Sequence, residues 1–200
     1  GFFVPGSQDP TMQELVRKLV HLVFGLLVAA MVLIAGQAAA TAILATGLLI
    51  GVVLVDLLLR GYRIPLFSFL VRHLDRNDRL PGRGALTFAV SALAVVVLFP
   101  VTISVPAIVT VAVLDSVTTI AGLRFGKHRI YNGKSWEGTL SGIAVTAIVL
   151  LPFLTPAGAA VVAILAGIIE LISPVDDNLV IPVAAAVLLA FMPAFLSFAP

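Results

Sequence analysis

Repeated long apolar stretches constrain this chain more than any other feature. A helix needs about 20 predominantly apolar residues to cross the hydrocarbon core of a membrane, and about 17 is a workable minimum. Only 11% of the residues are charged, against roughly 25% in a soluble domain, so charges are too few to cover a water-facing surface. The sequence therefore predicts an all-α, polytopic membrane bundle of about seven transmembrane helices. The predicted spans are 15–35, 38–59, 85–100, 103–122, 139–154, 157–172 and 179–196.

A length of 200 residues predicts one integral membrane domain over residues 12–200. Residues 1–11 are polar and contain Gly and Pro, and we expect them to be a non-native extension before a native start at Met12. The chain has no Cys, which excludes disulfides, thiol catalysis and Cys-ligated zinc. It has no basic tail, so nucleic acid is not an expected partner. The expected partners include membrane lipids, and the small-residue helices permit a homodimer.

The positive charges lie on one side of the predicted bundle. All twelve Lys and Arg fall in alternate connections or at adjacent helix ends, whereas the connections near Gly36, 100–105 and 153–158 are uncharged. Positively charged connections face the cytoplasm. We therefore expect a cytoplasmic N-terminus, an external C-terminus and any active site on the cytoplasmic side, where nucleotides are found.

The connection between the second and third spans has two parts. Residues 63–74 carry an apolar face, which predicts an amphipathic helix lying at the membrane interface. That face consists of Leu66, Phe67, Leu70 and Leu74. Residues 75–84 form a polar turn, which is either a solvated loop or a lid or anion-binding segment over a site.

Three polar residues open the first predicted helix. Arg17, Lys18 and His21 share one helical face, because residues three and four apart are neighbours. Arg17 and Lys18 could equally serve as snorkelling side chains that set the topology. His21 lies one turn deeper and needs a polar partner.

Asp115 lies inside the predicted span 103–122, where a carboxylate is costly and usually marks function. The structural alternative is an ion pair with Arg17 or Lys18 at the same level. Helical spacing aligns Asp115 with Ser116, Thr119 and Gly122, so one face of this helix leads from the acid to the loop that follows.

The loop 122–138 combines glycine with positive charge, which is typical of phosphate binding. Glycines permit close backbone approach and positive φ, and successive N–H groups in such turns form anion sites. Ser135 and Glu137 begin the next helix, whose N-terminus attracts phosphate, although Glu137 could instead only cap that helix. The spacing is not that of a Walker A loop. The glycines are Gly122, Gly126, Gly133 and Gly138, and the basic residues are Arg124, Lys127, Arg129 and Lys134.

The last polar cluster joins the sixth and seventh predicted helices. Glu170 lies in a last helical turn, where an acid is unfavourable against the helix dipole, so we expect it to have a specific partner. Asp176, Asp177 and Asn178 offer oxygen ligands of the kind that Mg²⁺ accepts. Asp177 or Asn178 could also be the N-cap of the seventh helix.

These motifs resemble the CTP-dependent polyprenol kinases, the dolichol kinase and phytol kinase family. The resemblance covers nearly all of residues 12–200, and its most specific part is the Lys134-Ser135-x-Glu137-Gly138 core with the upstream acid. The motifs are Arg17-Lys18-x-x-His21, the 75–84 loop, Asp115, Gly122-x-x-Phe125-Gly126-Lys127, Gly133-Lys134-Ser135-x-Glu137-Gly138, and Glu170 followed by Asp177-Asn178 and Pro182. Family members often have Glu where this chain has Asp75 or Asp78.

The resemblance implies a kinase that transfers the γ-phosphoryl group of CTP to the hydroxyl of a membrane isoprenoid alcohol, with Mg²⁺ as cofactor. The phosphatidate cytidylyltransferases share the central motif, which makes a CDP-lipid synthase the alternative. Their C-terminal Lys-Asp, Pro-Gly-His-Gly-Gly and Asp-Arg signature is absent here, which favours the kinase. A third hypothesis, a transporter, is disfavoured because the charges stop at one face of the bundle and mark no path across it.

The resemblance also implies roles for individual residues. Asp115, Lys134 and Glu137 are the expected catalytic residues, and Asp115 is either a base or a metal ligand. The expected Mg²⁺ ligands are Asp115, Glu137, Glu170 and Asp177. The expected nucleotide-binding residues are Arg17, Lys18, Gly122, Arg124, Gly126, Lys127, Lys134, Ser135 and Gly138, with His21 and Asn178 as supporting residues.

Overall fold

The structure, a computed structural model, describes residues 10–62, 64–65, 80–130 and 133–197. This part of the chain is helical and contains no strand, which confirms the predicted all-α class; it has two isolated bridges, Arg129 with Ser135 and Leu154 with Leu196. The helices are α1 (Pro10–Leu59), α3 (Arg83–Leu98), α4 (Val101–Phe125), α5 (Trp136–Leu150), α6 (Pro156–Ile172) and α7 (Asp177–Phe191), followed by the 3-10 helix η1 (Pro193–Phe195).

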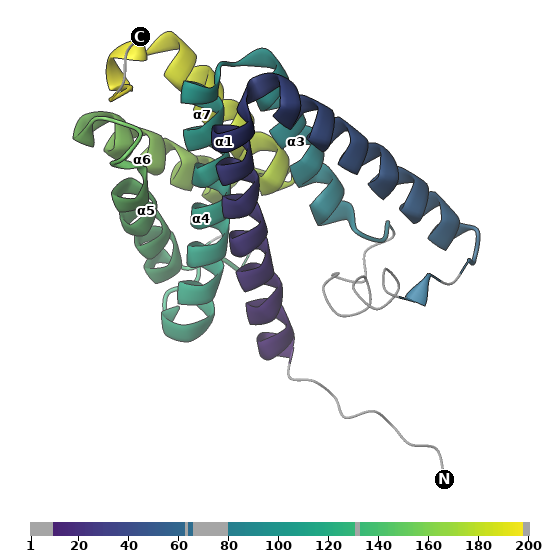
Figure 1. Cartoon of the computed structure of the whole chain (residues 1–200). Helices are drawn as coiled ribbons and strands as arrows, with labels where there is room; N and C mark the ends of the chain where they lie inside the picture. Colours follow the sequence, from purple (N-terminus) through teal and green to yellow (C-terminus); the bar gives the residue numbers. More distant parts are fainter. Residues whose placement is uncertain (1–9, 63, 66–79, 131–132, 198–200) are drawn as a thin grey trace.

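Helix α1 contains both of the first two predicted helices. They are joined at Gly36, whose φ of 77° and ψ of 173° lie outside the helical range in a region open essentially to glycine alone. The side-chain amide of Gln37 donates hydrogen bonds to the backbone carbonyls of Val96 at 2.9 Å and Phe99 at 3.3 Å. These bonds attach the bend to the end of α3, and the second half of α1 turns away from the first (Figure 1).

Helix α4 forms the centre of the molecule, with α1, α5 and α7 packed around it (Figure 1). Its residues from Ile103 to Ser116 are all buried. Helix α1 is the opposite case, because large apolar side chains such as Leu27, Ile34 and Leu49 are exposed along it. A polar residue on the inner length of α4 therefore faces other helices and needs a partner among them.

In the part of the chain that the structure describes, two helices, α1 and α4, are long and apolar enough to cross a membrane. The other four are apolar but have only 15 to 17 residues. The structure thus supports membrane-spanning helices, and the seven-span arrangement remains a prediction. The predicted interfacial helix of residues 63–74 lies almost wholly outside the described residues.

Short polar side chains fix where three helices begin. Ser135 accepts a hydrogen bond from the backbone N–H of Gly138 at 3.2 Å, and Thr155 accepts one from Gly158 at 3.2 Å. The N-cap of α7 is Asp176, which accepts from the Asn178 N–H at 3.1 Å. The alternative in which Asp177 or Asn178 caps this helix was therefore wrong, and both side chains remain available to the neighbouring cavity.

Candidate functional site

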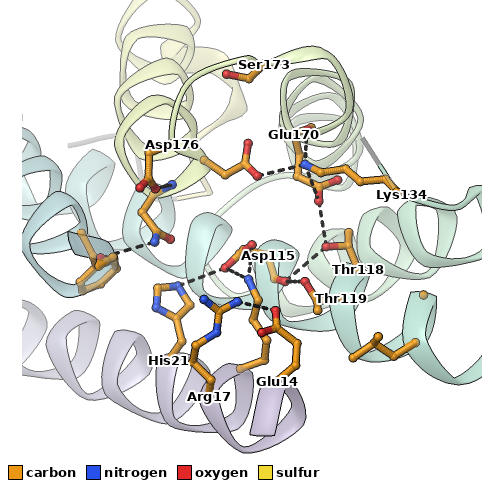
Figure 2. A pocket seen from close by; sticks show the side chains of 18 of the residues that line it. Glu14, Arg17, His21, Asp115, Thr118, Thr119, Lys134, Glu170, Ser173 and Asp176 are labelled. Carbon is orange, nitrogen blue, oxygen red and sulfur yellow. Dashed lines mark hydrogen bonds and ion pairs between the residues drawn. The ribbon is translucent and has the colours of Figure 1, made fainter. Parts of the chain in front are cut away.

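Charged residues from distant parts of the sequence surround one cavity of about 830 Å³ (Figure 2), a volume typical of small-molecule sites. Its walls come from α1, the start of α3, α4, the loop before α5, the end of α6 and the start of α7. The basic and acidic residues that line it are equal in number. They are Arg17, Lys18, Arg83, Arg129 and Lys134, and Glu14, Asp115, Glu170, Asp176 and Asp177.

A buried ion pair joins α1 to α4 at the floor of this cavity. The Lys18 ammonium donates to both carboxylate oxygens of Asp115, at 2.6 and 2.5 Å. The Ser116 hydroxyl donates to the backbone carbonyl of Lys18 at 3.0 Å, which holds the two helices in register. The structural alternative for Asp115, a pair with Lys18, is therefore present, and both of its oxygens already have a partner.

The other two residues of the N-terminal motif also reach the cavity. Arg17 pairs with Glu14 on the preceding turn, while its Nε is buried without a hydrogen bond. The Nε2 atom of His21 lies 3.7 Å from the nearer Asp115 oxygen and has no hydrogen-bond partner. The predicted shared face of Arg17, Lys18 and His21 is thus turned toward the site (Figure 2).

Lys134 joins the loop to the last two helices. Its ammonium lies 3.0 Å from an oxygen of Glu170 and 2.9 Å from an oxygen of Asp177, and it also donates to the backbone carbonyl of Glu170. Burial by itself would lower the pKa of Lys134, but the carboxylates of Glu170 and Asp177 hold that pKa above its ordinary value. The unfavourable position of Glu170 in a last helical turn is thus offset by this lysine and by the Thr118 hydroxyl, which donates at 3.1 Å.

Three buried oxygens on cavity-lining residues of α6 and α7 have no hydrogen-bond partner. They are Oε2 of Glu170, Oδ1 of Asp177 and Oδ1 of Asn178. The Asn178 amide is oriented by its own N–H group, which donates to the carbonyl of Gly84 at 3.4 Å. Burial raises the pKa of Asp177 to about 6, since the attraction of Lys134 only partly offsets the loss of hydration. Unpartnered buried oxygens are rare in folded proteins, so these residues of the cavity wall are suited to receive a ligand.

The unpartnered oxygens bear on the expected metal. Within the described residues, no group of three or more His, Cys, Asp or Glu is placed to hold an ion. Magnesium, however, usually takes only one or two protein carboxylates and completes its shell with water and substrate phosphates. Two carboxylates and one amide oxygen fit that requirement.

Glu137 lies away from the cavity. Its carboxylate contacts Nδ1 of His128 at 2.6 Å and accepts from the His128 backbone N–H at 3.3 Å, and these hydrogen bonds, the His128 side chain first, lower the pKa of Glu137 to about 2. It stabilises the loop before α5 instead of facing the other acids. The cavity lining also does not include Arg124, Gly126, Lys127 or Gly138.

The loop glycines serve mainly to let helices approach. A Cβ atom at Gly138 would lie 2.6 Å from the Thr118 carbonyl oxygen, and one at Gly126 would lie 2.6 Å from the Ser135 hydroxyl. Of the four, only Gly133 has a positive φ, of 74°. Among these four glycines, positive φ is therefore confined to Gly133, and the other three allow α5 to start against α4.

Sequence reasoning missed several residues of the site, among them Thr118 and Glu14. Thr118 hydrogen-bonds Glu170 from the turn after Asp115, and Glu14 pairs with Arg17 one turn earlier on α1. Thr118 is three residues from Asp115, and Glu14 is three residues from Arg17. Residues three apart on a helix are neighbours, so this spacing could have identified both. The predicted residues that do line the cavity are Arg17, Lys18, His21, Asp115, Gly122, Lys134, Ser135, Glu170, Asp177 and Asn178.

Fold and site together define an all-helical protein with helices apolar enough to span a membrane and a cavity of paired charges at the helix ends. The chain is 36% identical over 180 residues to the Uncharacterized protein MJ1137 of Methanocaldococcus jannaschii, an alignment that covers 88% of this chain and 92% of the relative. The chain belongs to the same family as that protein. No protein-family model matches the chain, and no solved structure matches it.

Proposed function

We propose that this protein is a CTP-dependent kinase that phosphorylates the hydroxyl of a membrane isoprenoid alcohol. The observation that carries the proposal is the arrangement of Lys134 between Glu170 and Asp177 in the cavity wall, where Glu170, Asp177 and Asn178 each have one unpartnered oxygen. An ammonium and free hard oxygens at one cavity suit a phosphate chain bound together with a divalent cation. The choice of CTP and of an isoprenoid alcohol comes from the sequence resemblance.

The proposal includes a multi-pass membrane protein with its site at the cytoplasmic side. Exposed apolar side chains along α1 form the kind of surface that lipid covers. The cavity also has an apolar wall that includes Val20, Phe24 and Phe88, next to its charged part. An isoprenoid alcohol would fit both parts of the cavity, with its apolar tail against the apolar wall and its hydroxyl beside the charged residues.

Glu170, Asp177 and Asn178 are the residues that would hold Mg²⁺. When bound, the cation would neutralise phosphate charge that develops during transfer. Asp115 is left out of this set because Lys18 occupies both of its oxygens. Lys134 would bind phosphate oxygens, and Arg17, with a buried Nε that lacks a partner, and Arg129 would add positive charge from the cavity wall. Phosphoryl transfer depends mainly on such positioning and neutralisation.

The proposal is tested with purified protein, Mg²⁺, a mixture of isoprenoid alcohols and phospholipids, and CTP labelled at either the α or the γ phosphate. We expect the γ label, and not the α label, in the lipid product on thin-layer chromatography. Transfer of the α label would instead establish the CDP-lipid synthase. If neither label enters the lipid and the protein does not bind CTP, both the kinase and the CDP-lipid synthase proposals would be contradicted.

Lys134→Met tests the central residue in the same assay. We expect turnover to fall at least about 100-fold, because the ammonium group that would bind and neutralise the phosphates is lost. Arg60→Met is the matched control, since Arg60 is exposed and pairs only with the exposed Asp56 in the described structure. Equal activity of the two variants would contradict the role of Lys134.

A further inference from the structure

His21 stands at the boundary between the charged and the apolar parts of the cavity. Its ring meets Phe88 edge-on with centroids 5.2 Å apart, and Phe24, one turn further along α1, contacts the same phenyl ring at 6.0 Å. On its other side lies Asp115, at 3.7 Å from Nε2 (Figure 2). A lipid whose tail follows the phenyl rings would bring its polar end to this imidazole.

The Nε2 atom of His21 is buried and lacks a hydrogen-bond partner. A buried polar atom of this kind is costly unless a ligand satisfies it. The ring position is fixed by aromatic contact with the fully enclosed Phe88, so the atom cannot easily turn elsewhere. It is therefore suited to make a hydrogen bond with the hydroxyl of an acceptor.

The other candidate bases of the cavity are already engaged. Both Asp115 oxygens accept from Lys18, which stabilises the ionised carboxylate and weakens it as a proton acceptor. Glu170 and Asp177 share the Lys134 ammonium and belong to the proposed cation site. His21 differs from these three acids because its unpartnered Nε2 lies next to the apolar wall formed by Phe24 and Phe88.

We propose that His21 is the general base of the transfer, an inference that rests on the proposed function. Nε2 takes the proton of the acceptor hydroxyl while that oxygen forms a bond to the γ-phosphorus. The bond from the γ-phosphorus to the β–γ bridging oxygen breaks, and the electron pair leaves with the nucleoside diphosphate. The imidazolium then releases its proton to solvent, so the reaction yields the lipid monophosphate, the diphosphate and one proton.

The surroundings of His21 suit this task. The Asp115 carboxylate lies 3.7 Å from Nε2, so its negative charge stabilises the imidazolium that forms when the ring takes the proton. Because Asp115 is held in place by Lys18 and by α4, it acts as a positioning residue for the ring.

The test uses His21→Ala in the full-length purified protein, with imidazole and substituted imidazoles of differing pKa added to the γ-label assay. General-base catalysis contributes typically about 10²- to 10⁴-fold, and we expect a loss of that size in kcat with CTP affinity unchanged. Added imidazoles should restore part of the rate, and the restored rate should rise with the pKa of the added base. His128→Ala is the matched control, since His128 is exposed and does not line the cavity; added imidazoles should leave its rate unchanged.

Three results would overturn the inference while leaving the kinase proposal intact. They are a His21→Ala variant with nearly normal kcat, a loss of rate that no imidazole restores, and a loss of rate accompanied by loss of CTP binding. If His21→Ala fails to fold, His21→Gln, which keeps much of the side-chain volume, takes its place: a rate within about threefold of wild type would also overturn the base role. Failure of the wild-type protein to transfer the γ label would instead reject the proposed function itself.

Discussion

Asp177 is a residue whose protonation is expected to differ between the folded and unfolded chain. Burial raises its pKa to about 6, so between about pH 4 and pH 6 the folded state binds a proton that the unfolded state has released. Stability from this group is therefore present below that window and is lost as the pH rises through it. At neutral pH the Asp177 carboxylate is ionised in the folded protein, although its burial disfavours the charged form.

Asp177→Asn should consequently stabilise the protein at pH 7.5 without Mg²⁺ or nucleotide, by up to roughly 3 kcal/mol. At pH 3.5 the variant and the wild type should unfold at nearly the same temperature. Thermal unfolding in detergent at both values, in the presence of a chelator, measures the difference. Asp56→Asn at the exposed end of α1 is the control, and a variant that is less stable than wild type at pH 7.5 would contradict the argument.

Among the elements, the contact of α4 with α5 depends on the absence of a side chain at Gly138. A methyl group there would lie 2.6 Å from the Thr118 carbonyl oxygen and 3.0 Å from the Cα of Gly122. Both atoms belong to the backbone of the tightly packed helix α4, so neither can move independently of the helix. The start of α5 carries the loop that holds Lys134, so the position of the lysine depends on this contact.

Gly138→Ala should destabilise the protein by about 1–3 kcal/mol, the usual cost of overpacking, and should weaken CTP binding at the same time. Gly47→Ala is a matched control on α1, because nothing lies within 4 Å of the added methyl group. There the substitution should be neutral or stabilise by up to about 1 kcal/mol, as alanine favours the helix. Unfolding curves of the two variants measure the free energies of unfolding. Equal changes for Gly138→Ala and Gly47→Ala would contradict the claim that α4 and α5 are too close at Gly138 for a methyl group.

Helices were the most predictable elements of this chain. The predicted span 157–172 agrees with α6 (Pro156–Ile172), and the predicted connection at Gly36 is the bend in α1, because apolar length and glycine are local signals. Partners across the fold were not predictable in the same way. The contact of Lys134 with Glu170 joins residues 36 positions apart and depends on how α6 packs. Glu137 was expected among the metal ligands, yet His128, nine positions earlier, binds it through a local turn.

The whole molecule is expected to cross the membrane several times with the cavity end inside the cell. Arg60, at the end of α1, is exposed, and so is Thr102, at the start of α4. The positive-inside pattern predicts that Arg60 lies on the cytoplasmic side of the membrane and Thr102 on the external side. Because the chain has no Cys, an introduced cysteine is its single thiol, and labelling of the purified chain reports on that position alone.

We expect a membrane-impermeant maleimide to label Thr102→Cys in intact cells. Arg60→Cys should react only after the membrane is opened, because its thiol would face the cytoplasm. A permeant maleimide applied to both variants shows that each thiol is reactive. Labelling of both positions from the same side would contradict the proposed topology.

The Lys18–Asp115 pair also has a consequence for how the chain is made. Its partners are 97 residues apart, so the lysine leaves the ribosome long before the carboxylate that neutralises it. Until α4 packs beside α1, the buried Asp115 carboxylate lacks the lysine that neutralises it. The packing of α4 against α1 is therefore the step in biosynthesis at which these two charges first neutralise each other.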